Sequence, residues 1–216
     1  MISRDPNDER AEVTSPISAK LTAIRGGLEV RAFSDEELLA GIRQGDGSVA
    51  AQFYDRLYPV IDHALRRVLR YRIAEFDDLV QVTFERIVRA IIEDRFAGRS
   101  ALTTWAAAIA GHVAIDFLRR SVRQRRVFEE LQRTLPAVAL DQRMEARSEI
   151  HQLHATLSKM KPSLAEAVVL FDVLGHSLEE VATLTGVSQS AVQSRLHRGR
   201  KELVRRAGSK AGRGLS

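Results

Sequence analysis

The sequence predicts an all-α protein, built from two small helical domains joined by a flexible linker. Apolar residues recur at steps of three and four along most of the 216-residue chain, and no segment alternates with period two. The chain holds only five prolines and thirteen glycines, which leaves room for long uninterrupted helices. The helical periodicity fades between Ser121 and Arg147, where Pro136 interrupts the chain, and this gap predicts the linker.

The composition excludes several classes of protein. Apolar residues make up 44% and charged residues 28% of the chain, which is typical of a folded globular protein. The absence of cysteine excludes a disulfide framework, thiol catalysis and a zinc ribbon. No apolar run reaches the roughly 20 residues of a membrane span, and the charged residues 1–10 do not resemble a secretory signal. We therefore expect a cytoplasmic protein without membrane insertion.

The first domain is predicted to occupy residues 34–122, after an N-terminal extension (1–33) that is expected to be disordered. Its first helix begins at a capping box, in which Ser34 and Glu37 satisfy each other's backbone amides, and ends near Gly45. A second helix follows, with Pro59 predicting a kink or a restart. The apolar residues of that helix lie on one face: Phe53, Leu57, Ile61, Leu65 and Val68.

Two more helices complete the first domain. The third is predicted over residues 77–93, with Asp77 and Asp78 near its positive N-terminus. Its buried stripe is Val80, Phe84, Ile87 and Ile91. The fourth follows a short loop, Phe96 to Ser100. Its inward residues are expected to be Leu102, Trp105 or Ala106, Ile109, Val113 and Phe117. Four helices with short connections make a compact domain.

The second domain is predicted over residues 148–206, after a linker of partial helicity at 123–147 and before a basic tail at 207–216. Its first helix carries Ile150, Leu153, Leu157 and Met160 at steps of three and four. Lys161 and Pro162 break the chain, and a capping box at residues 163–166 then predicts a second helix that Gly175 closes.

The strongest local signal is a helix-turn-helix motif at residues 177–206. A capping box formed by Ser177 and Glu180 starts a short helix, Gly186 permits a left-handed turn, and Ser188 caps the second helix. Uncharged polar side chains near the start of a helix can contact base edges in the major groove, and arginines can hold phosphates. The polar face is Gln189, Ser190, Gln193, Ser194 and His197, with Arg195, Arg198 and Lys201 as the candidate phosphate contacts.

The charge is distributed unevenly, which supports this interpretation. The net charge is +5 in total. Residues 34–118 hold thirteen acidic and ten basic residues, a balance of −3, whereas residues 119–216 hold ten acidic and eighteen basic residues, a balance of +8. The basic residues gather in two clusters, at 119–126 and 195–206, each in the last part of a predicted helix. Neutralisation of phosphates explains both clusters.

Nothing in the sequence predicts catalysis. We find no pair of carboxylates with a pocket signature, no metal-ligand spacing among the six histidines, and no glycine-rich phosphate loop. We therefore predict no catalytic residue, no metal site and no cofactor.

Several motifs, in order, resemble the extracytoplasmic-function (ECF) group of sigma-70-type RNA polymerase sigma factors. The first domain resembles sigma region 2 and the second resembles region 4. Each fragment is only moderately specific, whereas their order along one chain is highly specific. The fragments are residues 77–84, 96–100, 104–105, 109–110, 114–120, 178–182 and 192–198.

This resemblance implies a promoter-specificity subunit whose partners are core RNA polymerase, promoter DNA and an anti-sigma factor. Region 4 would meet the polymerase β flap near Leu170 to Gly175. The residues that would dock on the β′ clamp helices are Asp78, Leu79 and Gln81. Those that would bind the −10 element are Arg95, Arg99, Ser100, His112, Arg119, Arg120 and Arg123. Those that would bind the −35 element are Gln189, Ser190, Gln193, Ser194, Arg195, His197, Arg198 and Lys201.

The sequence departs from the family pattern at four positions, and it leaves other functions open. Val82 replaces an acidic residue, His112 an asparagine, Ser190 a glycine and Ala191 a threonine. A free-standing helix-turn-helix regulator would explain the second domain but not the polar face that carries Asp78. A serine recombinase would need an α/β catalytic domain, and a helical adaptor would use the basic surface for protein partners.

Overall fold

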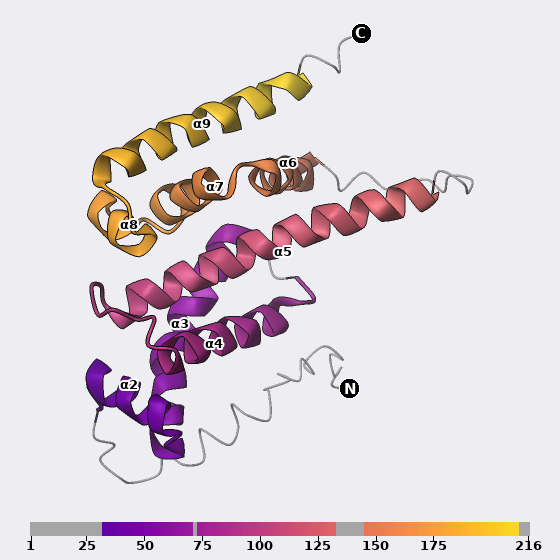
Figure 1. Cartoon of the computed structure of the whole chain (residues 1–216). Coiled ribbons are helices and arrows are strands. Elements are labelled where there is room, and N and C mark those ends of the chain that lie inside the picture. The colour runs from indigo at the N-terminus through magenta and orange to yellow at the C-terminus, as the bar shows by residue number, and fades with distance from the viewer. Residues whose placement is uncertain (1–31, 71–72, 133–144, 212–216) are drawn as a thin grey trace, which may run out of the picture.

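The computed structural model describes residues 32–70, 73–132 and 145–211, and helices dominate these ranges (Figure 1). No strand occurs in them, which confirms the predicted all-α class and gives no support to an α/β recombinase domain. The N-terminal extension up to residue 31 and the end of the basic tail, residues 212–216, lie outside the described residues.

Helix α2 (Asp35–Gln44) begins and ends as the sequence predicts. The Ser34 hydroxyl accepts a hydrogen bond from the Glu37 amide at 3.2 Å, and the Glu37 carboxylate accepts one from the Ser34 amide at 2.8 Å. Gly45 ends the helix in the left-handed conformation, at φ 70°. Arg43 then joins α2 to the end of α4 (Phe76–Ile92), since it contacts Asp94 at 2.7 Å.

Helix α3 (Gly47–Leu69) is one continuous element, so the restart predicted at Pro59 does not occur. Proline removes one intrahelical hydrogen bond, but Pro59 is exposed, so water can reach the carbonyl group that loses its partner. The predicted stripes of α3 and α4 are buried, except that Phe84 is only half-buried. α3 and α4 both pack against α5 (Leu102–Gln132).

Helix α5 is longer than predicted and is buried on two sides. It continues to Gln132, so the first part of the predicted linker is helical; residues 133–144 lie outside the described residues. Of the side chains predicted to point inward, Leu102, Ala106 and Val113 are at most 1% exposed, whereas Trp105, Ile109 and Phe117 are half-buried. Residues on a second face of α5 are buried as well: Ala108, Gly111, Ile115 and Leu118.

The second domain begins with α6 (Glu145–Lys159) and α7 (Pro162–Val168), which continues as a π-helical turn, η1 (Val169–Val173). The capping box predicted at Ser163 is wrong, because α7 starts two residues earlier and Lys161 is its N-cap, with no side-chain hydrogen bond. Pro162 suits the first helical position, where its missing amide costs nothing. Glu166 is thereby free of a capping role.

Helices α8 (Leu178–Thr185) and α9 (Gln189–Ala211) form the predicted helix-turn-helix. Ser177 and Glu180 make the predicted capping box, and Gly186 adopts φ 66° between the helices. Gly199 lies where α9 crosses α7: a Cβ atom there would fall 2.7 Å from Cγ2 of Val168. A larger residue fits this crossing only if the Val168 side chain or α7 itself shifts.

The two predicted domains pack directly against each other through α5. Figure 1 shows α5 between α3 and α4 on one side and α6 and α7 on the other, with α9 outermost. The buried apolar side chains of both domains form one continuous core. His154 of α6, 5% exposed, lies with its Nε2 3.3 Å from the carbonyl oxygen of Val68 in α3. The linker therefore joins two domains that are in contact in this structure.

Candidate nucleic-acid interface

Helix α9 has one buried face and one exposed polar face. Val192, Leu196 and Gly199 anchor it to the second domain. The opposite half of the helix is exposed and carries the predicted base-contacting residues, Gln189, Ser190, Gln193, Ser194 and His197. All of these lie within the first three turns, where a helix that enters a major groove meets base edges.

The start of α9 is fixed by its cap. The Ser188 hydroxyl accepts a hydrogen bond from the Ala191 amide at 3.2 Å and lies 3.0 Å from the hydroxyl of Ser190. The unpaired amides of the first turn are thereby partly satisfied, which holds the helix end in one conformation. Ser190, at a position where the family usually has glycine, takes part in this local polar contact.

The basic residues of α9 do not all have the same role. Arg198 and Lys201 are exposed, as phosphate contacts must be, whereas Arg195 is half-buried. Arg200 makes two hydrogen bonds to the Asp172 carboxylate, at 3.0 and 2.5 Å, and these raise its guanidinium pKa. Its guanidinium also lies 5.5 Å from the ring centre of Phe171. Arg200 therefore joins α9 to η1.

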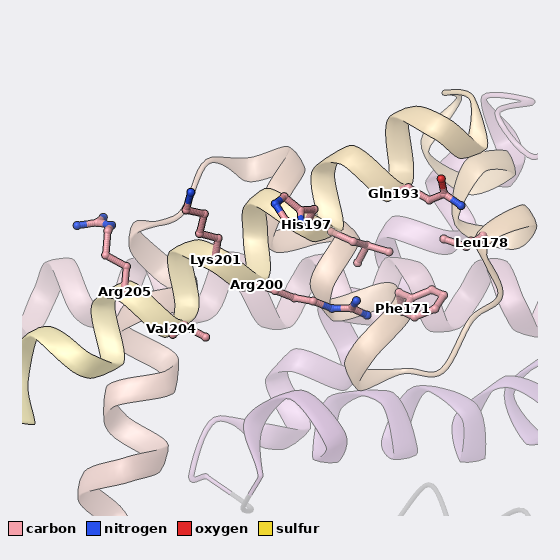
Figure 2. Close-up of a pocket in the computed structure, with 9 residues that line it drawn as sticks. Phe171, Leu178, Gln193, His197, Arg200, Lys201, Val204 and Arg205 are labelled. Atoms are coloured by element: carbon pink, nitrogen blue, oxygen red, sulfur yellow. The ribbon is translucent and has the colours of Figure 1, made fainter.

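A groove of about 720 Å³ runs along the exposed face of α9, beside α8 and η1 (Figure 2). Its apolar lining is Phe171, Leu178, Leu196 and Val204, and its polar lining is Gln193, His197, Arg200, Lys201 and Arg205. The groove thus includes two of the five base-contacting candidates, Gln193 and His197.

The predicted −10 residues lie in the loop before α5 and at two places along the helix, at His112 and near residue 120. Arg95, Arg99 and Ser100 are in the loop before the helix, where Arg95 pairs with Glu93 and Arg99 is exposed. Arg120 and two other arginines lie near residue 120, about 28 Å further along the helix at 1.5 Å per residue. That length corresponds to roughly eight nucleotides of one strand at 3.4 Å each.

Two of the −10 candidates are engaged by the second domain. Nε2 of His112 lies 2.7 Å from a carboxylate oxygen of Glu166 in α7, at ion-pair distance but off the line of a hydrogen bond. Arg119 donates a long hydrogen bond, 3.5 Å, to the carbonyl oxygen of Met160. Arg120 and Arg123 are exposed.

The predicted polymerase face of α4 is exposed at two of its three positions. Asp78 and Gln81 are exposed, and Gln81 donates a hydrogen bond to Glu85 at 3.1 Å. Leu79 is only 3% exposed, so a direct contact from this side chain is not available in this structure. Leu79 instead packs into the core beside the exposed residues Asp78 and Gln81.

Comparisons with known proteins agree with this arrangement. Family models for Sigma-70 region 2 and for Sigma-70 region 4 match residues 53–124 and 150–203. The RNA polymerase sigma factor CarQ of Myxococcus xanthus is 32% identical over 164 residues, which cover 74% of this chain and 90% of CarQ. The ECF RNA polymerase sigma factor SigE of Mycolicibacterium smegmatis is 31% identical over 185 residues, which cover 79% of this chain and 68% of SigE.

The chain belongs to the ECF group of the sigma-70 family. It is an RNA polymerase sigma factor, and sigma factors are regulatory rather than enzymatic proteins.

Two solved structures are similar to this chain with lower sequence identity. CnrH, in complex with the cytosolic domain of CnrY, has 24% identity over 81% of this chain and 97% of that one, with a TM-score of 0.48. RpoE of Bartonella quintana, in complex with the anti-sigma factor NepR, has 22% identity over 72% and 96%, with a TM-score of 0.44.

The sigma factor also has an aromatic cluster beside the acidic end of α4 that the sequence analysis missed. The ring of Tyr54 stacks on Phe84, with centroids 4.9 Å apart, and on Tyr58 at 5.3 Å. Burial, together with the nearby Tyr58, Asp55 and Asp77, raises the pKa of Tyr54. Tyrosines four residues apart on a helix were the available signal.

Neither a metal-binding cluster nor a membrane-spanning helix occurs within the described residues. No group of three or more histidine, cysteine, aspartate or glutamate side chains is arranged to hold a metal ion there. Among the helices of the same ranges, none combines the length and the apolar character that a membrane span needs.

Proposed function

We propose that region 4 of this sigma factor (148–206) recognises the −35 element through α9, while region 2 (34–122) binds the −10 element and core polymerase. The observation that carries the proposal is the division of α9 into a buried apolar half and an exposed polar half. Gln189, Gln193 and His197 lie on the exposed half, near the helix start, where base edges would be met.

In this proposal, the residues along α5 bind the separated strand of the −10 element. A base flipped into the loop formed by residues 95–100 loses a few kcal/mol of stacking, which contacts to the single strand must offset. Phe96 and Trp105, with ring centres 4.8 Å apart, offer an aromatic surface beside that loop. The arginines near residue 120 would hold the backbone of the same strand.

Asp78 and Gln81 dock on the β′ clamp helices in this proposal, and the surface near Leu170 to Gly175 meets the β flap. The solved complex of RpoE with the anti-sigma factor NepR makes an anti-sigma partner a reasonable proposal here too. The protein would work in the cytoplasm, with core polymerase and DNA. It would carry out no chemistry itself, and it would need no metal and no cofactor.

The DNA assignment is tested by two substitutions in the reconstituted holoenzyme. Gln193→Ala should relax the −35 sequence preference by roughly 1–3 kcal/mol, whereas Arg198→Ala should weaken binding to all sequences about equally and lower the salt slope by about 1. Arg67→Ala, an exposed arginine of α3 outside all the proposed surfaces, is the charge-matched control. The same change in preference from both α9 variants would refute the assignment.

The polymerase assignment is tested by charge reversal. Asp78→Arg should abolish co-purification with core polymerase, while Glu36→Arg, an equal reversal at an exposed site on α2, should not. Unchanged affinity of the Asp78→Arg variant would refute the assignment. Transcription by core polymerase plus the purified protein, from the DNA upstream of its own gene and from a genomic fragment library, tests the function as a whole.

A further inference from the structure

The first two turns of α9 expose uncharged polar side chains. The exposed residues there are Gln189, Ser190, Gln193 and Ser194. Between positions 189 and 197 the sequence has one charged side chain, that of Arg195. Arg195 is half-buried, and because it follows Gln193 by two residues, it lies on the other side of the helix. The part of α9 that would enter a major groove therefore presents amides and hydroxyls rather than charges.

The two glutamines of this part are free to bind. Within the part of the chain that the structure describes, the side-chain amides of Gln189 and Gln193 have no hydrogen-bond partner. The hydroxyl of Ser190, by contrast, lies 3.0 Å from the hydroxyl of Ser188 and is engaged at the start of the helix. A glutamine amide carries donors and an acceptor side by side, so each of the two can make a pair of hydrogen bonds with one base.

The chemistry of the base edges limits what this surface can select. Arginine and lysine pair with O6 and N7 of guanine, aspartate and glutamate accept from N4 of cytosine, and glutamine pairs with N6 and N7 of adenine. The exposed side of residues 189–197 has neither a cation other than a histidine nor a carboxylate. Serine hydroxyls contact several bases and discriminate weakly. Adenine is therefore the base that the start of α9 can select best.

The spacing of the two glutamines fits bases of one strand. They are four residues apart, which corresponds to one helical turn and a rise of about 6 Å. Two steps along one strand, at 3.4 Å each, span about 7 Å. Beside the glutamines stand the short side chains of Ser190 and Ser194, which allow the helix backbone to approach the base edges. The longer amides can then reach bases about two pairs apart.

The exposed cations of α9 lie further along the helix and suit phosphates. Nε of Arg198 donates a hydrogen bond to the carbonyl oxygen of Ser194 at 3.2 Å, which holds this side chain along the helix. Arg198 follows Gln193 by five residues, so the two point to different sides of α9. His197 lies one turn beyond Gln193, near Lys201 (Figure 2). The helix therefore changes there from base contacts to phosphate contacts.

We infer that this sigma factor selects a −35 element with two adenines on one strand, about two base pairs apart, which Gln189 and Gln193 contact at N6 and N7. The start of α9 makes no arginine contact to guanine. The inference rests on the proposed function of α9 and adds the identity of the bases that it reads. Arg198 and Lys201 supply affinity that does not depend on sequence, so selectivity at these two positions depends on the amides.

The test uses the full-length chain in the holoenzyme, with a promoter that the unmodified holoenzyme transcribes. Randomisation of the −35 region, followed by selection of bound DNA, should enrich adenine at two positions. Gln189→Ala should lose the preference at one position and Gln193→Ala at the other, each by about 5- to 100-fold. Gln193→Arg should change the preference at its position from adenine to guanine. Gln44→Ala, which removes an exposed amide of α2, is the matched control and should keep both preferences.

A modified base tests the same contact without a change in the protein. 7-Deazaadenine lacks the N7 acceptor and still pairs with thymine. At the position assigned to Gln193, it should weaken binding of the unmodified holoenzyme about fivefold, and it should not weaken binding of the Gln193→Ala holoenzyme further. Equal weakening of both would mean that adenine is selected through DNA shape rather than by the glutamine, and would overturn the inference.

The outcomes also separate this inference from the proposed function. Selection of guanine at either position by the unmodified holoenzyme would overturn the inference, as would retention of both adenine preferences by both alanine variants. If the unmodified chain directs no initiation from any fragment of a genomic library, the proposed function fails instead.

Discussion

Gly199 of α9 lies against Val168 of α7 so closely that a single added carbon atom would stand 2.7 Å from Cγ2 of Val168 and 3.3 Å from the backbone oxygen of Leu164. Helix α9 contributes no side chain of its own at this point, so its backbone lies directly against the Val168 side chain and the Leu164 carbonyl of α7. Helix α9 is thereby held at a fixed distance from α7, which sets the direction in which its exposed face points.

Gly199→Ala should therefore destabilise region 4, although alanine favours helices in general. Overpacking of a closed contact costs typically 1–3 kcal/mol, more than the roughly 1 kcal/mol that alanine gains over glycine in a helix. Thermal and urea unfolding would measure the change. Gly47→Ala is the control, since no atom lies within 4 Å of a Cβ there and a small gain is expected. Equal stability of the Gly199→Ala protein and the parent would refute the crossing argument.

The pair formed by Arg200 and Asp172 should contribute little on its own to stability. Both side chains are partly exposed, at 51% and 31%, so solvent screens the two hydrogen bonds. A double-mutant cycle with Arg200→Ala and Asp172→Ala should give a coupling free energy of about 0.5–1 kcal/mol that falls as salt is added. A coupling well above this range, insensitive to salt, would mean that the pair is more buried in solution.

His176 should make stability depend on pH near neutrality. Burial lowers its pKa below 6.5, against the opposing effect of Glu180, and its Nε2 is buried without a hydrogen-bond partner. As the pH falls through 6.5, the unfolded chain binds a proton before the folded one does, so stability is lost from that pH downward. The melting temperature of His176→Gln should decline less between pH 7.5 and about 5 than that of the parent. His63→Gln, which removes an exposed histidine of α3, is the control.

Glu180 should also make the stability of the fold decrease in acid. The fold favours the charged form of Glu180, whereas it favours the neutral form of His176. The hydrogen bond from the Ser177 amide lowers the pKa of this carboxylate below 4.5, with further contributions from the Ser177 and Thr104 side chains. A lowered carboxylate pKa stabilises the fold above 4.5, and this contribution is lost as the pH falls through the folded value. Glu180→Gln should cost about 0.5–1 kcal/mol at pH 7, with less cost in acid. Glu179→Gln, at the exposed neighbour, should cost nothing measurable.

The sequence was sufficient for features that depend on a few neighbouring residues. Ser34 and Ser177 predicted their helix starts because capping involves only residues three apart, and Gly186 predicted its turn because few other residues adopt that conformation. The order of the family motifs predicted the function. Each of these signals involves residues that are close together in the sequence, or is an ordered series of such motifs.

Features that depend on contacts between distant segments were not predictable in the same way. The nearly all-apolar run from Leu102 to Leu118 signals a helix buried on more than one side, but one-sided burial was expected. Gly111 and Gly199 lie inside helices, where glycine is not needed for a turn. No local signal in the sequence therefore reveals that they allow close packing between helices. Glu166 was assigned to a cap because the sequence cannot show that Pro162 starts the helix or that His112 lies opposite.

Because α5 packs against partners on both of its sides, the two halves of this protein are not freely interchangeable parts. A chimera that received region 4 from a relative would present a new surface to Gly111, and a bulkier residue than Val169 or Leu174 would have no room there. Promoter preference could then change for a reason unrelated to base contacts. Exchange of −35 specificity between relatives would need the matching side of α5 to be transferred together with α9.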